Sequence, residues 1–290
     1  MSNRPTAVIT GATNGIGQAT AIELARRGFD IGIICRNPKK GDDTEALIAD
    51  AAPEANVTIL LADYCHLASV RAVAPQIVET FPVIDVFVNN AGIHNPTQRI
   101  TDDGFDEMLQ VNYLAPFLLT ELLLPHLEKQ DRCRIVNVGS EAHRLGGSVD
   151  DDVLTTVPKP YGTRGALTYY GKTKLLDVLW TLELARRVDG RKLTANTLCP
   201  GMVNTGLFDE SSFTQSLSKL FVRVGIVRTP ERGARMSIWQ ASDPDAEKVN
   251  GRFLTSTAPA KLLPTRRVVR DASRQARLYD DTVKLLAPVG

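Results

Sequence analysis

Short β-branched runs alternate with amphipathic segments along almost the whole chain, and this alternation constrains the fold more than any other feature. Seven runs have the composition of strands, and the first six are largely apolar on both faces: 6–10, 30–35, 57–62, 84–90, 133–139, 193–200 and 251–254. Helical patterns lie between them, at 15–28, 38–51, 67–80, 103–129, 165–188 and 230–241. We therefore expect one α/β domain over residues 1–290, with a single Rossmann-type, doubly wound parallel sheet of about seven strands flanked by helices.

The bulk properties of the chain argue against several classes of function. The 290 residues carry a formal net charge of +1 and their basic residues are scattered, so a nucleic-acid surface is not expected. The four cysteines form no C-x-x-C pair, which makes a disulfide framework or a metal site improbable and fits a reducing compartment. No apolar signal core precedes the first strand, and the longest apolar run, 114–127, is shorter than the ~18 residues of a membrane span. We expect a cytoplasmic protein without an integral membrane segment.

A glycine-rich turn, TGATNGIG at 10–17, leads directly from the first strand into a helix. Gly11 allows a sharp turn, Gly15 lets the backbone approach a ligand, and Gly17 lets helix and strand pack closely. The helix N-terminus then presents free N–H groups to a phosphate. An ordinary turn is the alternative, but the position after the first strand favours a dinucleotide site. The spacing G-x-x-x-G-x-G differs from the G-x-G-x-x-G fingerprint.

Two adjacent tyrosines, Tyr169 and Tyr170, stand in the segment LTYYGKTKLL (167–176) of a predicted helix. A free tyrosine has a pKa of ~10 and is a poor base at neutral pH. A lysine one helical turn away lies on the same face, and its charge favours the phenolate. Tyr170 has Lys174 at this spacing, whereas Tyr169 has Thr173. Tyr170 is therefore the acid/base candidate, and the alternative is an ordinary amphipathic helix start.

These motifs resemble the short-chain dehydrogenase/reductase family, and most closely its retinol-dehydrogenase-like branch. The resemblance runs over roughly residues 5–255, in the order of the family's motifs: TGATNGIG (10–17), NNAG (89–92), Ser140 closing the fifth strand, Y-x-x-x-K at 170–174, and PG (200–201). It implies an enzyme that transfers a hydride between a nicotinamide cofactor and the carbonyl or alcohol of a small, lipophilic or aliphatic molecule, with Tyr170 passing the proton.

The resemblance also assigns roles to the other site residues. Ser140 polarises the substrate carbonyl oxygen, Lys174 also holds the nicotinamide ribose, and Asn112 keeps a water in the proton relay, where a kinked helix could expose a carbonyl. Asp63 is implied to accept from the adenine amine. The implied cofactor-binding residues are Gly11, Thr13, Asn14, Gly15, Ile16, Gly17, Arg36, Asn37, Asp63, Asn90, Ala91, Gly92, Tyr170, Lys174, Pro200, Gly201, Val203 and Thr205.

The end of the second strand bears on the choice of cofactor. Cys35 stands where the family's NAD users carry Asp, and Arg36 follows it. A guanidinium group matches a 2′-phosphate, whereas an acid at this place would repel it. We expect NADP(H) to be preferred over NAD(H), and a solvated basic turn is the alternative.

Several features allow more than one interpretation. Thirty positions separate Ser140 from Tyr170, more than in the family's simplest members, and the polar segment 141–166 between them is predicted to be a loop beside the site. His143 suggests a Ser–His hydrolase, but GSEAH lacks the second glycine of the G-x-S-x-G elbow. The sequence also leaves open an isomerase or dehydratase of the same family, and a non-catalytic nucleotide-sensing protein on this fold.

Two further segments and a pairing mode complete the expectations. The segment 204–227 is predicted to form a substrate lid, and 264–290 a helical tail. The resemblance makes a homodimer through the helices at 103–129 and 165–188 an option. The apolar side chains that would support this pairing could equally pack inward: Leu175, Leu176, Leu179 and Leu182.

Overall fold

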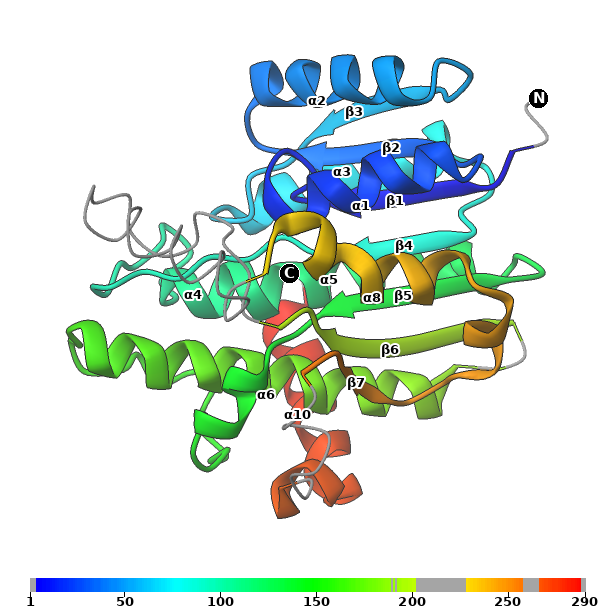
Figure 1. Cartoon of the computed structure of the whole chain (residues 1–290). Helices are drawn as coiled ribbons and strands as arrows, with labels where there is room; N and C mark the ends of the chain where they lie inside the picture. The colour runs from blue at the N-terminus through cyan, green and yellow to red at the C-terminus, as the bar shows by residue number, and fades with distance from the viewer. Residues whose placement is uncertain (1–3, 189, 191, 202–227, 258–265, 288–290) are drawn as a thin grey trace.

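A single parallel sheet forms the centre of the molecule. A computed structural model describes residues 4–188, 190, 192–201, 228–257 and 266–287. The strand order is β3-β2-β1-β4-β5-β6-β7, and every neighbouring pair is parallel (Figure 1). The strands are β1 (Thr6–Thr10), β2 (Asp30–Cys35), β3 (Val57–Leu61), β4 (Val86–Asn89), β5 (Cys133–Val138), β6 (Leu193–Cys199) and β7 (Phe253–Thr255). The predicted seven-stranded parallel sheet is confirmed, with strand ends within two residues of those expected.

Helices cover both faces of this sheet, which explains why its strands are apolar on both sides. In β1, Val8 packs into one core cluster and its neighbour Ile9 into the other. One face is covered by α1 (Gly15–Arg26), α2 (Pro38–Ala51) and α8 (Pro230–Ser242), and the other by α3 (Leu67–Thr80), α5 (Ala115–Leu127) and α6 (Thr163–Arg187) (Figure 1). Alternate side chains of one strand therefore enter opposite layers.

The predicted helix 103–129 is interrupted. Asp106 accepts a hydrogen bond from the backbone N–H of Met108 at 2.9 Å, and α4 (Glu107–Leu109) begins only after this cap. A π-helical turn, Gln110–Leu114, then leads into α5. One-turn π segments inside helices are frequent at functional sites, and this one contains Asn112.

By length and composition alone, the helical run Glu107–Leu127 would pass for a membrane span, with a mean hydropathy of 1.2. However, 78% of its most apolar window is buried inside the protein. The apolar character of this run is therefore accounted for by its place in the core under the sheet.

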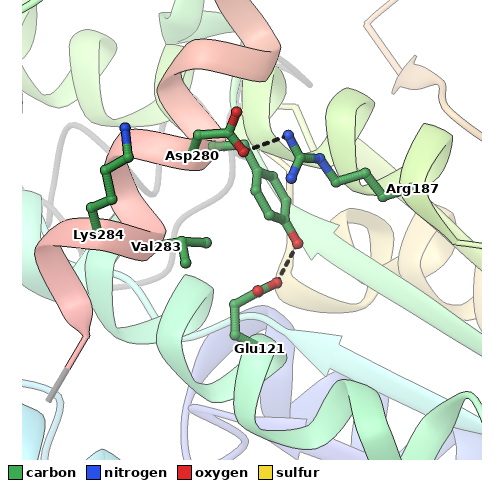
Figure 2. Close-up of a pocket in the computed structure, with 6 residues that line it drawn as sticks. Glu121, Arg187, Asp280, Val283 and Lys284 are labelled. Carbon is green, nitrogen blue, oxygen red and sulfur yellow. Dashed lines mark hydrogen bonds and ion pairs between the residues drawn. The ribbon is translucent and has the colours of Figure 1, made fainter.

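The C-terminal helix α10 (Ala272–Leu286) forms an outer layer on α5 and α6. The hydroxyl groups of Tyr113 and Thr282 lie 2.7 Å apart in a fully buried contact. At the outer edge of this contact, Tyr279 of α10 donates to Glu121 of α5, and Arg187 of α6 lies 2.8 Å from Asp280 of α10 (Figure 2). Three of the leucines considered for pairing are fully buried in the core beneath this layer: Leu175, Leu176 and Leu179.

We predict that Thr282→Val lowers the free energy of unfolding by about 1–3 kcal/mol, because it leaves the buried Tyr113 hydroxyl without its partner. Equilibrium urea unfolding measures the loss. The matched control is Val283→Thr, an exposed neighbour on the same helix, which should stay within about 0.5 kcal/mol of wild type. Equal effects of the two substitutions would contradict the docking of α10 through this contact.

Candidate active site

The glycine turn after β1 adopts the conformation that its glycines allow. Gly11 and Gly15 have φ values of +64° and +53°, a region that other residues rarely adopt. A Cβ added at Gly17 would lie 2.4 Å from the carbonyl oxygen of Gly11, so the first turn of α1 lies directly against the loop. The N–H groups of that turn are the donors that an anion accepts from. This backbone fits the pyrophosphate of a dinucleotide.

Asn90 joins the glycine turn to the end of β4. Its side-chain amide donates to the carbonyl oxygens of Thr10 at 2.9 Å and Gly11 at 3.1 Å. The Thr10 hydroxyl in turn accepts from the N–H groups of Asn90 and Ala91, both at 3.0 Å. β1 and β4 are neighbours in the sheet, with β2 and β5 on their outer sides, so these contacts lie where the strand order reverses. Open α/β sheets bind ligands at such a switch point.

Tyr170 and Lys174 lie one turn apart on α6, and both are buried. The Lys174 Nζ donates to the carbonyl oxygen of Val138, at the end of β5, at 3.1 Å. A Cβ added at Gly92 would lie 3.7 Å from this Nζ, which places Lys174 beside the loop that follows β4. The predicted pair therefore faces the carboxyl ends of the central strands. The ring of Tyr169 instead stacks on that of Tyr161.

Ser140 reaches Tyr170 in spite of the twenty-nine residues between them. It follows β5 and caps the short helix η2 (Glu141–Leu145), where its Oγ accepts from the N–H of Ala142 at 3.1 Å. This short helix packs on the backbone of α6, because a Cβ added at Gly171 would lie only 2.5 Å from the Ala142 carbonyl oxygen. Gly171 is thus the neighbour of Tyr170 that allows η2, and with it Ser140, to approach.

Burial raises the pKa of Tyr170, and the neighbouring groups modify this effect in opposite directions. The Lys174 charge and the contact with the Ser140 hydroxyl act to lower the pKa, while the carboxylate of Asp177 acts to raise it. The ring of His94 meets that of Tyr170 edge-on, with centroids 5.5 Å apart. With its pKa raised, Tyr170 holds its proton at neutral pH and is ready to donate it.

Asn112 lies in the π-helical turn and is held on three sides. Its Oδ1 accepts from the N–H of Ile93 at 2.7 Å, and its Nδ2 donates to the Ile93 carbonyl at 2.9 Å and the Thr173 hydroxyl at 3.1 Å. These bonds fix the loop after β4 against α6, next to Lys174. The predicted role of Asn112 in a water relay remains a prediction.

The residues predicted to bind the adenosine end of a dinucleotide lie where β2 and β3 finish. Arg36 is exposed at the end of β2, and Asn37 caps α2 by accepting from the Lys40 N–H at 3.1 Å. Lys39 lies 3.0 Å from Asp43, whereas no ion pair of Arg36 occurs among the described residues. Asp63 follows β3 and accepts from the N–H of Cys65 at 2.9 Å. Arg36 therefore carries a cation that is available to a ligand.

Only part of the segment after β6 is described. Arg228 donates to the carbonyl oxygen of Pro200 at 3.1 Å and lies over Gly201, whose φ is +89°. Two predicted cofactor residues, Val203 and Thr205, lie outside the described residues, and so does the predicted lid at 204–227.

The segment 141–166 is anchored to the domain at several points that the sequence did not reveal. Val149 and Leu154 are buried in the core, and the Tyr161 hydroxyl donates to Asp106 at 2.8 Å. From the C-terminal tail, Arg266 donates to the carbonyl oxygens of His143 at 3.1 Å and Gly147 at 2.7 Å. The expected loop is therefore a fixed wall beside Tyr170. These contacts join residues far apart in the chain, and no local pattern signals them.

His143 does not form the Ser–His pair of a hydrolase. Its Nδ1 lies 2.8 Å from the carbonyl oxygen of Ser140, and its ring packs edge-on against Phe253, with centroids 4.5 Å apart. Burial lowers the pKa of His143, which keeps the ring neutral. His143 thus supports the backbone at Ser140. Across the ranges that the structure describes, no group of His, Cys, Asp and Glu could hold a metal ion.

A surface cavity of about 530 Å³ lies between α5, α6 and α10, away from this chemistry (Figure 2). Arg187, on its rim, follows Tyr170 by seventeen residues on α6, which is about 25 Å along the helix. Among the residues that line it, Arg187 pairs with Asp280 and Glu121 accepts from Tyr279. This cavity is formed where α10 packs on α5 and α6, and it is separate from the predicted group of Tyr170, Lys174 and Ser140.

Comparisons with known proteins agree with this geometry. The family model described as short chain dehydrogenase matches residues 5–149. Human retinol dehydrogenase 14 is 34% identical over 95% of this chain and 84% of its own, and mouse polyprenol dehydrogenase is 34% identical over 98% and 84%. The fold is also that of an actinorhodin polyketide ketoreductase variant solved with NADPH, at 22% identity and a TM-score of 0.69, covering 90% of this chain and 98% of that one.

We predict that Arg266→Met speeds amide hydrogen exchange in the segment 143–149, because two carbonyl groups lose a charged donor worth about 1.5–3 kcal/mol each. Exchange followed by mass spectrometry gives the rates. Arg267→Met, an exposed change at the next position, serves as the control and should leave them unchanged. Unchanged exchange in both variants would show that the tail does not hold this segment.

Proposed function

Because this chain belongs to the short-chain dehydrogenase/reductase family, we propose that it is an NADP(H)-dependent oxidoreductase that acts on the carbonyl or alcohol group of a lipophilic small molecule. The coarser part, a dehydrogenase or reductase acting on CH–OH or C=O with a nicotinamide cofactor, follows from the family. The proposed passage of the proton through Tyr170 is supported above all by the meeting of Tyr170, Lys174 and Ser140 beside the glycine turn.

The nicotinamide dinucleotide, when bound, supplies or accepts the hydride. The glycine turn and the first turn of α1 would hold its phosphates. Ser140 donates a hydrogen bond to the substrate oxygen and stabilises the charge that develops there. Tyr170 donates its proton to that oxygen in the reduction, and takes it back in the oxidation. Lys174, charged and one turn away, stabilises the phenolate that forms when Tyr170 has donated its proton.

The proposed preference for NADP(H) rests on Arg36. Its exposed guanidinium follows β2, at the place where an acid would accept the ribose hydroxyls of NAD(H), and Cys35 offers no such acceptor. A planar guanidinium binds a phosphate through two parallel hydrogen bonds. The NADPH-bound ketoreductase of the same fold shows only that the fold accommodates this cofactor.

The proposed substrate class is supported by the apolar surroundings of Tyr170. Met108, Ala166 and the rings of Tyr161 and Tyr169 pack around it as one apolar cluster. Apolar surroundings of the reacting group favour lipophilic or aliphatic alcohols and the corresponding aldehydes or ketones. The names of the two relatives, a retinol and a polyprenol dehydrogenase, are consistent with this class.

We predict that Tyr170→Phe lowers kcat by about 10²–10⁴-fold on a panel of lipophilic aldehydes and ketones, because the proton donor is lost. NADPH oxidation followed spectroscopically gives the rates. NADPH affinity should persist, and Tyr169→Phe, which removes the adjacent hydroxyl, should retain most activity. A wild-type protein that binds NADPH but turns over nothing on a broad panel would favour a nucleotide-sensing role.

We predict that Arg36→Asp weakens NADPH binding at least tenfold and improves NADH binding, because a phosphate contact is replaced by a repulsive charge. Fluorescence titration of wild type and variant with both cofactors measures the change. The matched control, Arg26→Asp, places the same charge change at the far end of α1 and should leave the ratio unaltered. Equal affinities of the wild type for the two cofactors would refute the proposed preference.

A further inference from the structure

A buried carboxylate, Asp177, stands behind the catalytic pair and has no part in the mechanism described so far. It is 4% exposed, and its Oδ2 lies 2.8 Å from the Nζ of Lys174, which is 5% exposed. The indole N–H of Trp180 donates to its other oxygen at 3.4 Å. Asp177 follows Lys174 by three residues and Tyr170 by seven, so all three lie on one face of α6.

Burying an ion pair costs free energy, and the pair adds little to the stability of the fold. A buried ion pair is often no more stable than apolar residues of the same shape, because both charges must leave water. Breaking the pair from one side is far worse, since it leaves a charge buried without a partner. A role in the reaction therefore accounts for an ion pair at the centre of the site better than stability does.

We propose that Asp177 is a positioning residue of the reaction, which fixes the ammonium group of Lys174 between the Val138 carbonyl and Gly92 and offsets its charge beside Tyr170. This inference rests on the proposed function, in which Tyr170 donates the proton. Lys174 has three N–H donors. Asp177 and Val138 take two of them, which leaves the third for a ligand.

The effect of Asp177 on the pair follows from its charge. Burial acts to lower the pKa of Lys174, but Asp177 and Tyr170 outweigh it and leave that pKa raised. Asp177 also acts to raise the pKa of Tyr170. Both protons of the Tyr170–Lys174 pair are therefore held to higher pH than they would be without the carboxylate.

The other titratable groups around the pair do not reproduce this effect. Burial lowers the pKa of His94, next to Tyr170, and raises the pKa of the Cys199 thiol at the end of β6. Tyr113, on the π-helical turn facing Asp177, has its pKa raised by burial. His94 is thus neutral above pH 7, and Cys199 and Tyr113 keep their protons. Among these groups, Asp177 is therefore the one whose charge raises the pKa values of Tyr170 and Lys174.

The first test is the pH profile of carbonyl reduction in Asp177→Asn, which keeps the shape and removes the charge. Reduction requires both Tyr170 and Lys174 to be protonated, so its rate falls as the first of these protons is lost. Removing a negative charge makes that loss easier whichever group gives up the proton. We expect the alkaline limb of kcat/KM with NADPH to move to lower pH by about one unit.

The second test does not depend on turnover. In Asp177→Asn, burial without the carboxylate should bring the pKa of Lys174 below its unfolded value. The unfolded state then binds the extra proton, and the variant gains stability as the pH rises. The wild-type pair, with its raised pKa, shows no such gain. The deficit in the urea midpoint of the variant should therefore narrow between pH 7 and pH 10.

Glu183→Gln is the matched control, because it removes a buried acid from the same helix about 20 Å beyond Tyr170. Its partners are Arg186 and Arg187, with Arg187 at 2.9 Å, and arginines keep their protons throughout this range. The control should leave the alkaline limb in place and lose a constant amount of stability at all these pH values.

The outcomes separate this inference from the proposed function. If Tyr170→Phe abolishes the turnover of the wild type, the proposed function stands. If Asp177→Asn then leaves the alkaline limb of kcat/KM in place and shows a constant stability deficit, the role of Asp177 is overturned. A moved limb and a narrowing deficit support it. Without wild-type turnover the proposed function fails, and a constant deficit in the unfolding series would still overturn the role of Asp177.

Discussion

The hydrogen bonds of Asn90 are the interaction on which the rest of the site depends. The chain leaves β1 toward β2 on one side and returns to β4 on the other, so the loops that follow these two strands part from each other. Asn90 bonds to Thr10 and Gly11 and closes that gap. The glycine turn and the loop that bears Gly92 thereby become one wall, and Lys174 is placed against it from α6.

The local parts of this architecture could be predicted from the sequence, because local patterns encode them. Alternating composition located all seven strands, and helical spacing selected Tyr170 with Lys174. The sequence predicted one helix over 103–129. Its late start at Glu107 and its π turn were not predicted, since both depend on what packs against them. Asp177 carried a local signal, an acid three residues after a lysine in a predicted helix, but its burial depends on the whole fold.

The contacts that bring Ser140 to Tyr170 belong to the part that could not be predicted. The family resemblance assigned both residues, but the twenty-nine residues between them carry no local pattern that would bring the two side chains together. Their meeting depends on Gly171, which has no side chain and so lets η2 pack closely on α6. It also depends on His143, whose ring contacts the Ser140 carbonyl, and on Arg266, which donates to the His143 carbonyl. Each of these contacts links distant parts of the chain, and none has a characteristic spacing.

The direction in which the site is poised follows from the balance of charge around Tyr170. Lys174 alone would favour the phenolate, the form that removes a proton from an alcohol. With Asp177 at 2.8 Å the lysine is part of an ion pair, and burial, the largest influence on the pKa of Tyr170, disfavours the phenolate. On the function proposed above, the free enzyme therefore has its proton on Tyr170 at neutral pH. A tyrosine in that state can donate the proton that carbonyl reduction needs, whereas alcohol oxidation needs the phenolate.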